Sequence, residues 1–256
     1  MKKLFIISSI ILCIPLIAYA ESDQILITLS DTMNQIEFDG KWSFFTEWKR
    51  SSQDLFDNGN IVLRTAHQGD FIYVFIDNLS DSTPEKKLDY AIVCIDGKND
   101  KSTLPDDNDY CFMGVLGNSD GFTYNGYSPS QNGNFRKVSN DPETVMIGGE
   151  SDENDRYSGF THSSYEFKIP IKLIGRENTY GFYFSTYDNN QKKIFHWPES
   201  SNFDKSHYIP SPSTWGKLIS PDKSLPEFPL SLPVLAITMI VIVIVSKIKF
   251  DFRINS

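Results

Sequence analysis

The stretch Asp70-Phe71-Ile72-Tyr73-Val74-Phe75-Ile76-Asp77 decides the fold class of this 256-residue chain. Every position from Phe71 to Ile76 is β-branched or aromatic, which is typical of a strand that is covered on both faces. A similar run, Ile61 to Thr65, precedes it, and Gln68-Gly69-Asp70 supplies the turn of a hairpin. The sequence therefore predicts a central strand in one of two stacked sheets.

Further runs of this kind recur along the chain between polar turns, and no stretch keeps a helical period. The strands expected from them are 88–95, 111–116, 165–171, 180–187 and 193–197, the last after the turn Asp188-Asn189-Asn190. Two long segments, 96–109 and 119–163, are expected as loops, the second with a short strand at 121–127. We therefore expect an all-β domain over residues 21–219, a two-sheet antiparallel β-sandwich of the jelly-roll type.

The first twenty residues have the layout of a secretory signal peptide. Lys2 and Lys3 precede an apolar run from Leu4 to Ile17, and Ala18-Tyr19-Ala20 offers small residues for cleavage after Ala20. An uncleaved N-terminal anchor is the alternative, although the run is short for a membrane span. With residues 1–20 removed, the chain is expected on the extracellular side of the cell membrane.

A second apolar block, Leu230 to Val245, carries no charge, and Lys247, Lys249 and Arg253 follow it. Sixteen helical residues span about 24 Å, and the flanking residues bring 229–246 close to the ~30 Å hydrocarbon core of a bilayer. The basic residues behind such a block stay in the cytoplasm. The sequence thus predicts a single transmembrane helix at 229–246, a cytoplasmic tail at 247–256 and a protein anchored with its N-terminus outside.

The predicted stalk at 220–228 contains Pro226-Glu227-Phe228 directly before the apolar block. With that block and the basic tail, the motif resembles the tripartite Pro-Glu-Phe sorting signal of archaeal surface proteins. The resemblance implies processing by an archaeosortase, a membrane transpeptidase that exchanges the span for another anchor. The alternative is a plain stop-transfer helix behind a proline-rich segment.

The charge balance excludes a nucleic-acid-binding protein. The chain has 24 Lys and Arg against 33 Asp and Glu, a net charge of −9. Duplex binding depends on basic side chains that neutralise phosphates. An acidic surface of this kind attracts cations instead.

Two cysteines remain once Cys13 leaves with the leader. Cys94 and Cys111 are an even pair in an exported domain, so we expect one disulfide, which stabilises the fold by about 3 kcal/mol on loop-entropy arguments. Two free buried thiols are the alternative. CxxC-type metal spacing is absent from the sequence.

The segment between these cysteines is rich in oxygen donors. Its candidate metal ligands are Asp96, Asn99, Asp100, Asp107 and Asp109. Ca²⁺ takes six to eight oxygen ligands and tolerates irregular loops, so calcium is the candidate cofactor. EF-hand spacing is missing, and a solvated loop held by Asx turns is the alternative.

The order of elements resembles the family 9 carbohydrate-binding-module-like sandwich, which is related to the DOMON superfamily. The matching stretches are Ile36–Trp42 with Glu47-Trp48, Asp70–Asp77, Tyr90–Asp100, Tyr165–Pro170, and Phe195–Pro198 with Pro212–Leu218. The resemblance implies a sandwich that binds sugars, in a group where structural calcium is common. Relatives bind haem and many have no established ligand, so fold alone leaves the function open.

Sugar sites use aromatic ring faces together with Asn, Asp or Arg for the hydroxyls. The candidate ligand-binding residues are Trp197, Tyr187, Tyr127 and Asn189. Trp42 and Trp215 fall at framework positions of the resembled family, so we expect them to pack in the core. His162 is expected to be a structural hydrogen-bonding residue, and the acidic run 150–155 to be solvated.

No catalytic motif is present. G-x-S-x-G, H-E-x-x-H and a phosphate-binding glycine loop are all missing, and no histidine and methionine pair has a spacing typical of haem ligation. The sequence therefore predicts a non-catalytic, membrane-anchored binding module for carbohydrate. A structural protein of an archaeal envelope, in contact with other surface proteins, is the alternative; a haem-binding domain and a glycoside hydrolase rank behind both.

Overall fold

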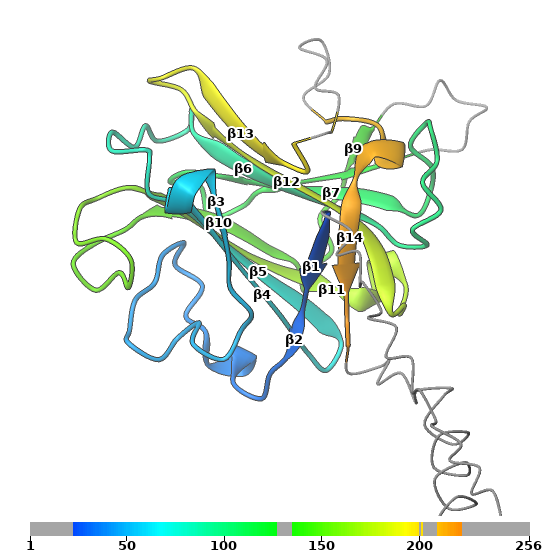
Figure 1. Cartoon of the computed structure of the whole chain (residues 1–256), viewed down its shortest axis with the longest axis horizontal. Helices are drawn as coiled ribbons and strands as arrows, with labels where there is room; N and C mark the ends of the chain where they lie inside the picture. The colour runs from blue at the N-terminus through cyan, green and yellow to red at the C-terminus, as the bar shows by residue number, and fades with distance from the viewer. Residues whose placement is uncertain (1–22, 127–134, 200, 202–208, 222–256) are drawn as a thin grey trace, which may run out of the picture.

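The computed structural model describes residues 23–126, 135–199, 201 and 209–221. These residues form two β-sheets that pack against each other, with few helical residues (Figure 1). Most strand pairs are antiparallel; β1 with β14 and β2 with β4 are parallel. The predicted all-β, two-sheet architecture is confirmed.

The larger sheet has eight strands in the order β1-β14-β12-β6-β7-β8-β9, with β13 also paired to β12. Their bounds are β1 Gln24–Leu26, β6 Tyr90–Asp96, β7 Asp109–Val115, β8 Phe122–Asn125, β9 Arg136–Val138, β12 Thr179–Asp188, β13 Lys193–Trp197 and β14 Gly216–Ile219.

The smaller sheet has six strands in the order β10-β11-β5-β4-β2, with β3 also paired to β4. Their bounds are β2 Thr28–Leu29, β3 Asp54–Phe56, β4 Ile61–Gln68, β5 Phe71–Asn78, β10 Val145–Glu150 and β11 Ser163–Pro170. The helical segments are α1, Ile171–Ile174, and the 3₁₀ turns Met33–Gln35, Asp57–Gly59 and Pro212–Thr214.

Strand β5 occupies the central position that its sequence predicts. It pairs with β4 on one side and with β11 on the other. Ile72, Val74 and Ile76 pack in the core between the sheets, whereas Tyr73 and Phe75 belong to a second apolar cluster on the outer face. Both faces are buried because side chains alternate along a strand and each face has its own cover.

The short strand expected at 121–127 is confirmed as β8, but the rest of the segment 119–163 is not the loop that was expected, because it contains β9 and β10. Strand β10 pairs along its whole length with β11, although its sequence includes Gly148 and Gly149. Glycine has a low strand propensity, which hides the strand from a sequence pattern. A Cβ at Gly148 would lie 2.8 Å from the Tyr165 ring, so close packing requires glycine there.

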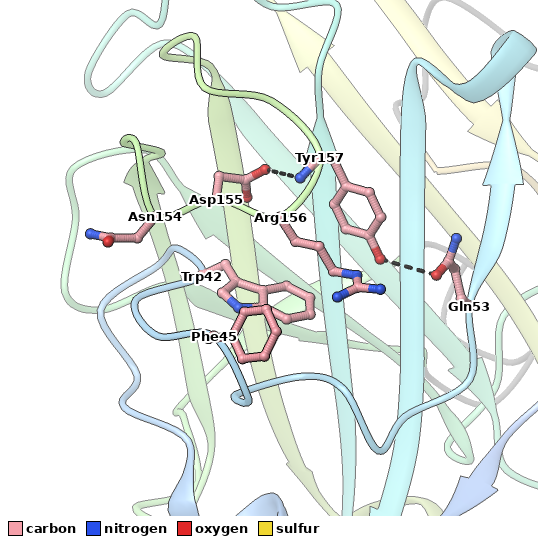
Figure 2. Close-up of a pocket in the computed structure, with 7 residues that line it drawn as sticks. All are labelled: Trp42, Phe45, Gln53, Asn154, Asp155, Arg156 and Tyr157. Atoms are coloured by element: carbon pink, nitrogen blue, oxygen red, sulfur yellow. Dashed lines mark hydrogen bonds between the residues drawn. The ribbon is translucent and has the colours of Figure 1, made fainter.

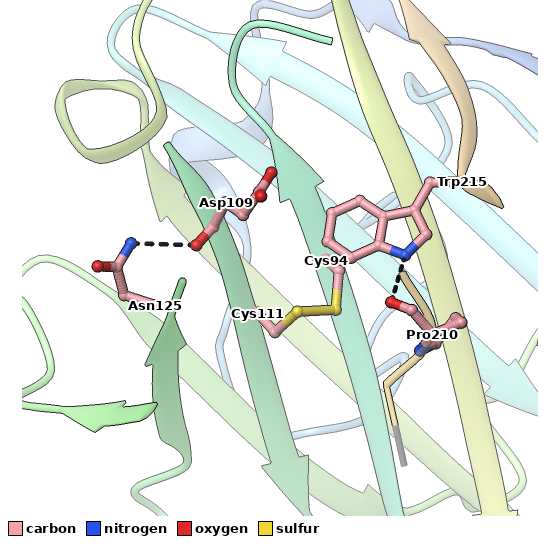
Figure 3. The surroundings of a disulfide bond; sticks show 6 residues. All are labelled: Cys94, Asp109, Cys111, Asn125, Pro210 and Trp215. Atoms are coloured by element: carbon pink, nitrogen blue, oxygen red, sulfur yellow. Dashed lines mark hydrogen bonds between the residues drawn. A yellow bond between two sulfur atoms is a disulfide. The ribbon is translucent and has the colours of Figure 1, made fainter. Parts of the chain in front are cut away.

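Cys94 and Cys111 face each other in β6 and β7 and form a disulfide (Figure 3). They belong to a buried cluster that also contains Trp215. The Trp215 indole Nε1 donates a hydrogen bond to the Pro210 carbonyl at 3.1 Å. The cross-link therefore ties two neighbouring strands beneath the segment that leads into β14.

In the part of the chain that the structure describes, no helix is long and apolar enough to cross a lipid bilayer. The predicted signal peptide, the Pro226-Glu227-Phe228 motif, the transmembrane helix at 229–246 and the tail at 247–256 lie outside the described residues.

Candidate binding site

The outer face of the six-stranded sheet is covered by the segment 30–53, which crosses β4 and β5 (Figure 1). Trp48 stacks on Phe75 with 5.4 Å between ring centroids, and Trp42 meets the same ring edge-on at 6.1 Å. Trp42 and Trp48 are buried, so the expected core role of Trp42 is confirmed. This apolar layer gives the sheet a second, smaller core.

Glu166 of β11 anchors that segment to the sheet. Its carboxylate accepts hydrogen bonds from the backbone N–H of Asp39 at 3.0 Å and of Gly40 at 2.8 Å, and from Trp48 Nε1 at 2.9 Å. Burial raises the pKa of Glu166 well above its usual value, while the donors favour the charged form. Gly40 has a φ of +87°, and a Cβ there would lie 2.3 Å from the Gly149 nitrogen. The Asp-Gly pair is therefore needed for the backbone to approach the sheet.

A pocket of about 500 Å³ opens beside this layer (Figure 2). Two segments that are distant in sequence line it: Trp42, Phe45, Gln53, Asn154, Asp155, Arg156 and Tyr157. Phe45 is the most open of its aromatic residues, with 75% of its surface exposed. Trp42 is only 1% exposed, so the rings that the pocket offers to a ligand are those of Phe45 and the half-buried Tyr157, beside amide, guanidinium and carboxylate groups.

Arg64 holds this pocket from beneath. It is only 4% exposed, and its guanidinium donates to the Tyr157 hydroxyl at 2.7 Å, the Gln53 Oε1 at 2.8 Å and the Trp48 carbonyl at 3.0 Å. The Tyr157 hydroxyl donates in turn to Gln53 Oε1 at 3.2 Å. The Arg64 Cζ also lies 5.2 Å from the centroid of the Trp42 ring, within the range of a cation–π contact. One buried cation therefore fixes three residues of the pocket wall.

The pocket's chemistry suits a neutral polar ligand. Ring faces can stack on the CH surface of a sugar, and amides such as Gln53 and Asn154 can bond its hydroxyls. Asp155 is the single carboxylate among the described residues that line the pocket.

None of the three described sequence-predicted ligand residues, Trp197, Tyr187 and Asn189, lines this pocket. Trp197 is 6% exposed and packs on Phe184 in the main core, so its ring offers little surface to a sugar. Tyr187 stacks on Tyr90 at 5.1 Å, and Asn189 donates its backbone N–H to Asp89 at 2.7 Å. Tyr127 lies outside the described residues. A ligand role for Tyr187 and Asn189 stays a prediction.

The acidic run 150–155 was expected to be solvated, and this is wrong for Asp155. Its Oδ2 is buried, and its Oδ1 accepts the backbone N–H of Tyr157 at 2.7 Å and of Ser158 at 2.9 Å. Asp152 pairs with Lys41. The loop is folded against the sheet, and its polar composition does not predict these contacts because they depend on residues distant in sequence.

The predicted calcium loop is brought together in part. Asp96 and Asp109 face each other in β6 and β7, and both are buried, whereas Asp100 and Asp107 are exposed. Asp96 accepts backbone N–H groups at both of its oxygens, in the manner of Asx turns.

Two other oxygens of this loop suit a cation. Asp109 Oδ1 and Asn99 Oδ1 are buried without a hydrogen-bond partner among the described residues. Burial, with the nearby Asp96 charge, raises the pKa of Asp109 to about 7, although an N–H from Asp106 opposes this. Calcium binding at this loop stays a prediction.

No protein-family model matches the chain, and no curated protein matches its sequence. Among solved structures, the chain is similar to a family 9 carbohydrate-binding module from Caldicellulosiruptor kristjanssonii in complex with cellotriose. The two are 12% identical, with a TM-score of 0.45, and the match covers 77% of this chain and 93% of that one. The glucose complex from the same organism is 12% identical, with a TM-score of 0.46, and the match covers 77% of this chain and 95% of that one. A protein from Bacteroides uniformis is 13% identical, with a TM-score of 0.43, and the match covers 77% of this chain and 99% of that one. At these TM-scores the likenesses do not indicate which ligand this chain binds.

Proposed function

We propose that this chain is a non-catalytic, surface-anchored module that binds carbohydrate in the pocket of Figure 2. The observation that carries the proposal is that the buried Arg64 holds the Tyr157 ring and the Gln53 amide in a pocket that also presents the exposed ring of Phe45. Preorganised aromatic and amide groups bind with little loss of side-chain entropy. Gln53 already accepts two bonds at Oε1, which leaves its amide N–H groups to donate to a ligand hydroxyl.

The anchoring is also proposed from the sequence. A cleaved leader at 1–20, a span at 229–246 and the Pro226-Glu227-Phe228 motif would place the domain on the outer face of the membrane, with an archaeosortase as the processing partner. A stalk of a few residues would keep the pocket close to that surface. Glycans of the envelope are then the accessible class of ligand.

A structural Ca²⁺ ion is proposed at the loop of Asp96, Asn99 and Asp109. The two buried oxygens without partners, Asp109 Oδ1 and Asn99 Oδ1, support it. Calcium should raise the Tm of the full chain and EDTA should lower it. Calcium-independent melting would contradict this part of the proposal and leave the sugar site untouched.

A glycan array tests the binding site. The full chain should be purified in a detergent without a sugar headgroup, because a maltoside would compete for the pocket. We expect binding to at least one glycan class, with at least a tenfold loss in Phe45→Ala and in Gln53→Ala. Phe160→Ala is the matched control, since Phe160 is 84% exposed but does not line the pocket.

Two results would reject this function. One is a wild-type chain that binds no glycan, and the other is a Phe45→Ala variant that binds as tightly as the wild type. Either would favour the alternative of an envelope protein that contacts other surface proteins, for which the exposed rings of Phe45 and Phe160 offer apolar surface.

A further inference from the structure

Three titratable side chains meet behind the wall of the pocket. Asp77 lies in β5, Asp155 lies in the loop that lines the pocket, and His162 directly precedes β11. One ligand atom from each of the three lies within 4.8 Å of the others. Asp77 and His162 are fully buried. The sugar-binding proposal does not use any of these three groups to contact the ligand hydroxyls.

The orientation of His162 is fixed by its surroundings. Its Nδ1 lies 2.7 Å from the Phe160 carbonyl oxygen, which can only accept, so Nδ1 carries the proton. The Ser151 hydroxyl lies 2.8 Å from the same nitrogen and also accepts the His162 backbone N–H. Nε2 then faces Asp77 Oδ1 at 2.6 Å. The carbonyl on Nδ1 fixes the ring orientation, as it does in metal-ligating histidines, while Nε2 is in direct hydrogen-bond contact with Asp77 in the metal-free chain.

Two carboxylate oxygens at this position lack partners. Asp77 Oδ2 and Asp155 Oδ2 are both buried, and neither has a hydrogen-bond partner among the described residues. Buried polar atoms are rarely left unpaired, and each such atom calls for a bound ion, water or proton. Asp77 Oδ2 belongs to a side chain with no exposed surface and lies in the same cluster as the imidazole.

We propose that Asp77, Asp155 and His162 form a binding site for a divalent metal ion of the zinc type. An imidazole nitrogen with two carboxylates is a donor set that Zn²⁺ accepts, whereas Ca²⁺ and Mg²⁺ take oxygen ligands. Ligand atoms around a tetrahedral zinc lie roughly 3.4 Å apart, so His162 Nε2 and Asp77 Oδ1, which are 2.6 Å apart, would separate by side-chain rotation to admit the ion. Water would complete the coordination.

The site has a route to solvent and a consequence for the pocket. Asp155 lines the pocket, and its neighbour Tyr157 bonds Arg64 beneath it. A metal bound by Asp155 would therefore tie the pocket loop to β5 and to the start of β11. Because the ligands must give up their protons, zinc affinity should fall below neutral pH.

Zinc titration of the full chain, stripped with a chelator and dialysed, tests the site. Calorimetry should show one zinc-dependent binding event that Mg²⁺ does not produce. At a free zinc concentration of 100 times Kd, the Tm should rise by about 5 °C or more. Asp155→Asn should weaken zinc binding at least tenfold, and it lies in a loop, where the fold tolerates substitution better than at Asp77.

Asp152→Asn is the matched control, because Asp152 stands in the same loop but pairs with Lys41 outside the cluster. It should bind zinc as the wild type does. The proposal is overturned if the wild type binds no zinc, or if Asp155→Asn binds it unchanged.

Discussion

Arg64→Lys is the most informative single substitution for the architecture of the pocket. The guanidinium reaches Tyr157, Gln53 and Trp48 from three different nitrogens at 2.7–3.0 Å. A lysine keeps the charge but has one nitrogen, so it cannot meet three acceptors that are spread around a planar fork. At least two of these charge-assisted hydrogen bonds are then lost, although Gln53 Oε1 keeps the Tyr157 hydroxyl and the Trp48 carbonyl keeps the Ser51 hydroxyl.

The expected cost follows from that count. A hydrogen bond to a charged group contributes about 1.5–3 kcal/mol, so the loss of two in Arg64→Lys should lower the free energy of unfolding by about 3 kcal/mol. For a domain of this size the Tm should fall by roughly 6–12 °C. Carbohydrate affinity should fall as well, because Gln53 and Tyr157 lose their common anchor.

Urea denaturation of the full chain measures this directly, with an unchanged m-value as the sign that only stability has changed. Arg156→Lys is the matched control, because Arg156 also lines the pocket but is exposed. Its effect should stay within about 0.5 kcal/mol. A loss below about 1 kcal/mol in Arg64→Lys would refute the idea that the fork organises the pocket.

Three further outcomes are expected. Gly40→Ala should destabilise the domain by about 3 kcal/mol or more in urea denaturation, because the new Cβ would lie 2.3 Å from a backbone atom. Gly59 has a similar φ of +90° but open space around it, so Gly59→Ala should cost only about 1 kcal/mol. Equal losses of stability in the two variants would rule out the close approach at Gly40. Replacing Cys94 and Cys111 by alanine should lower stability by about 3 kcal/mol, and a variant as stable as the wild type would show that the disulfide contributes nothing. Burial, and then two neighbouring carboxylates, raise the pKa of Asp81 to about 6. A raised folded-state pKa means that the folded chain holds a proton that the unfolded chain has lost, so stability should fall as pH rises from about 4 to 6. Asp81→Asn should flatten that part of the pH profile, and an unchanged slope would assign it to other groups.

Local composition was enough to predict the strands that carry the core. Phe71 to Ile76 is apolar at every position, and its two faces are buried in two different clusters. The hairpin turn at Gly69 and most neighbouring strands follow from the same pattern. Strand β10 was missed because close packing selected glycine where a pattern needs a β-branched residue.

Residue type could not show which aromatic residues are exposed. Trp197 and Phe45 are both large rings beside polar residues, yet Trp197 is buried in the core and Phe45 is open. Trp197 is buried because β13 pairs with β12, and the exposure of Phe45 follows from the path of segment 30–53 across the sheet. Neither is encoded in the neighbouring residues alone.

The amino-acid order by itself determined the short β-branched and aromatic runs, and hence the all-β class and the burial of β5 on both faces, because such runs act within a few residues. Only the tertiary structure decided that Arg64 would meet Gln53 and Tyr157, and that Asp77 would meet Asp155 and His162. These encounters join positions up to 93 residues apart. They depend on strand register and on where two loops settle over one sheet, and a small shift of either would separate the groups.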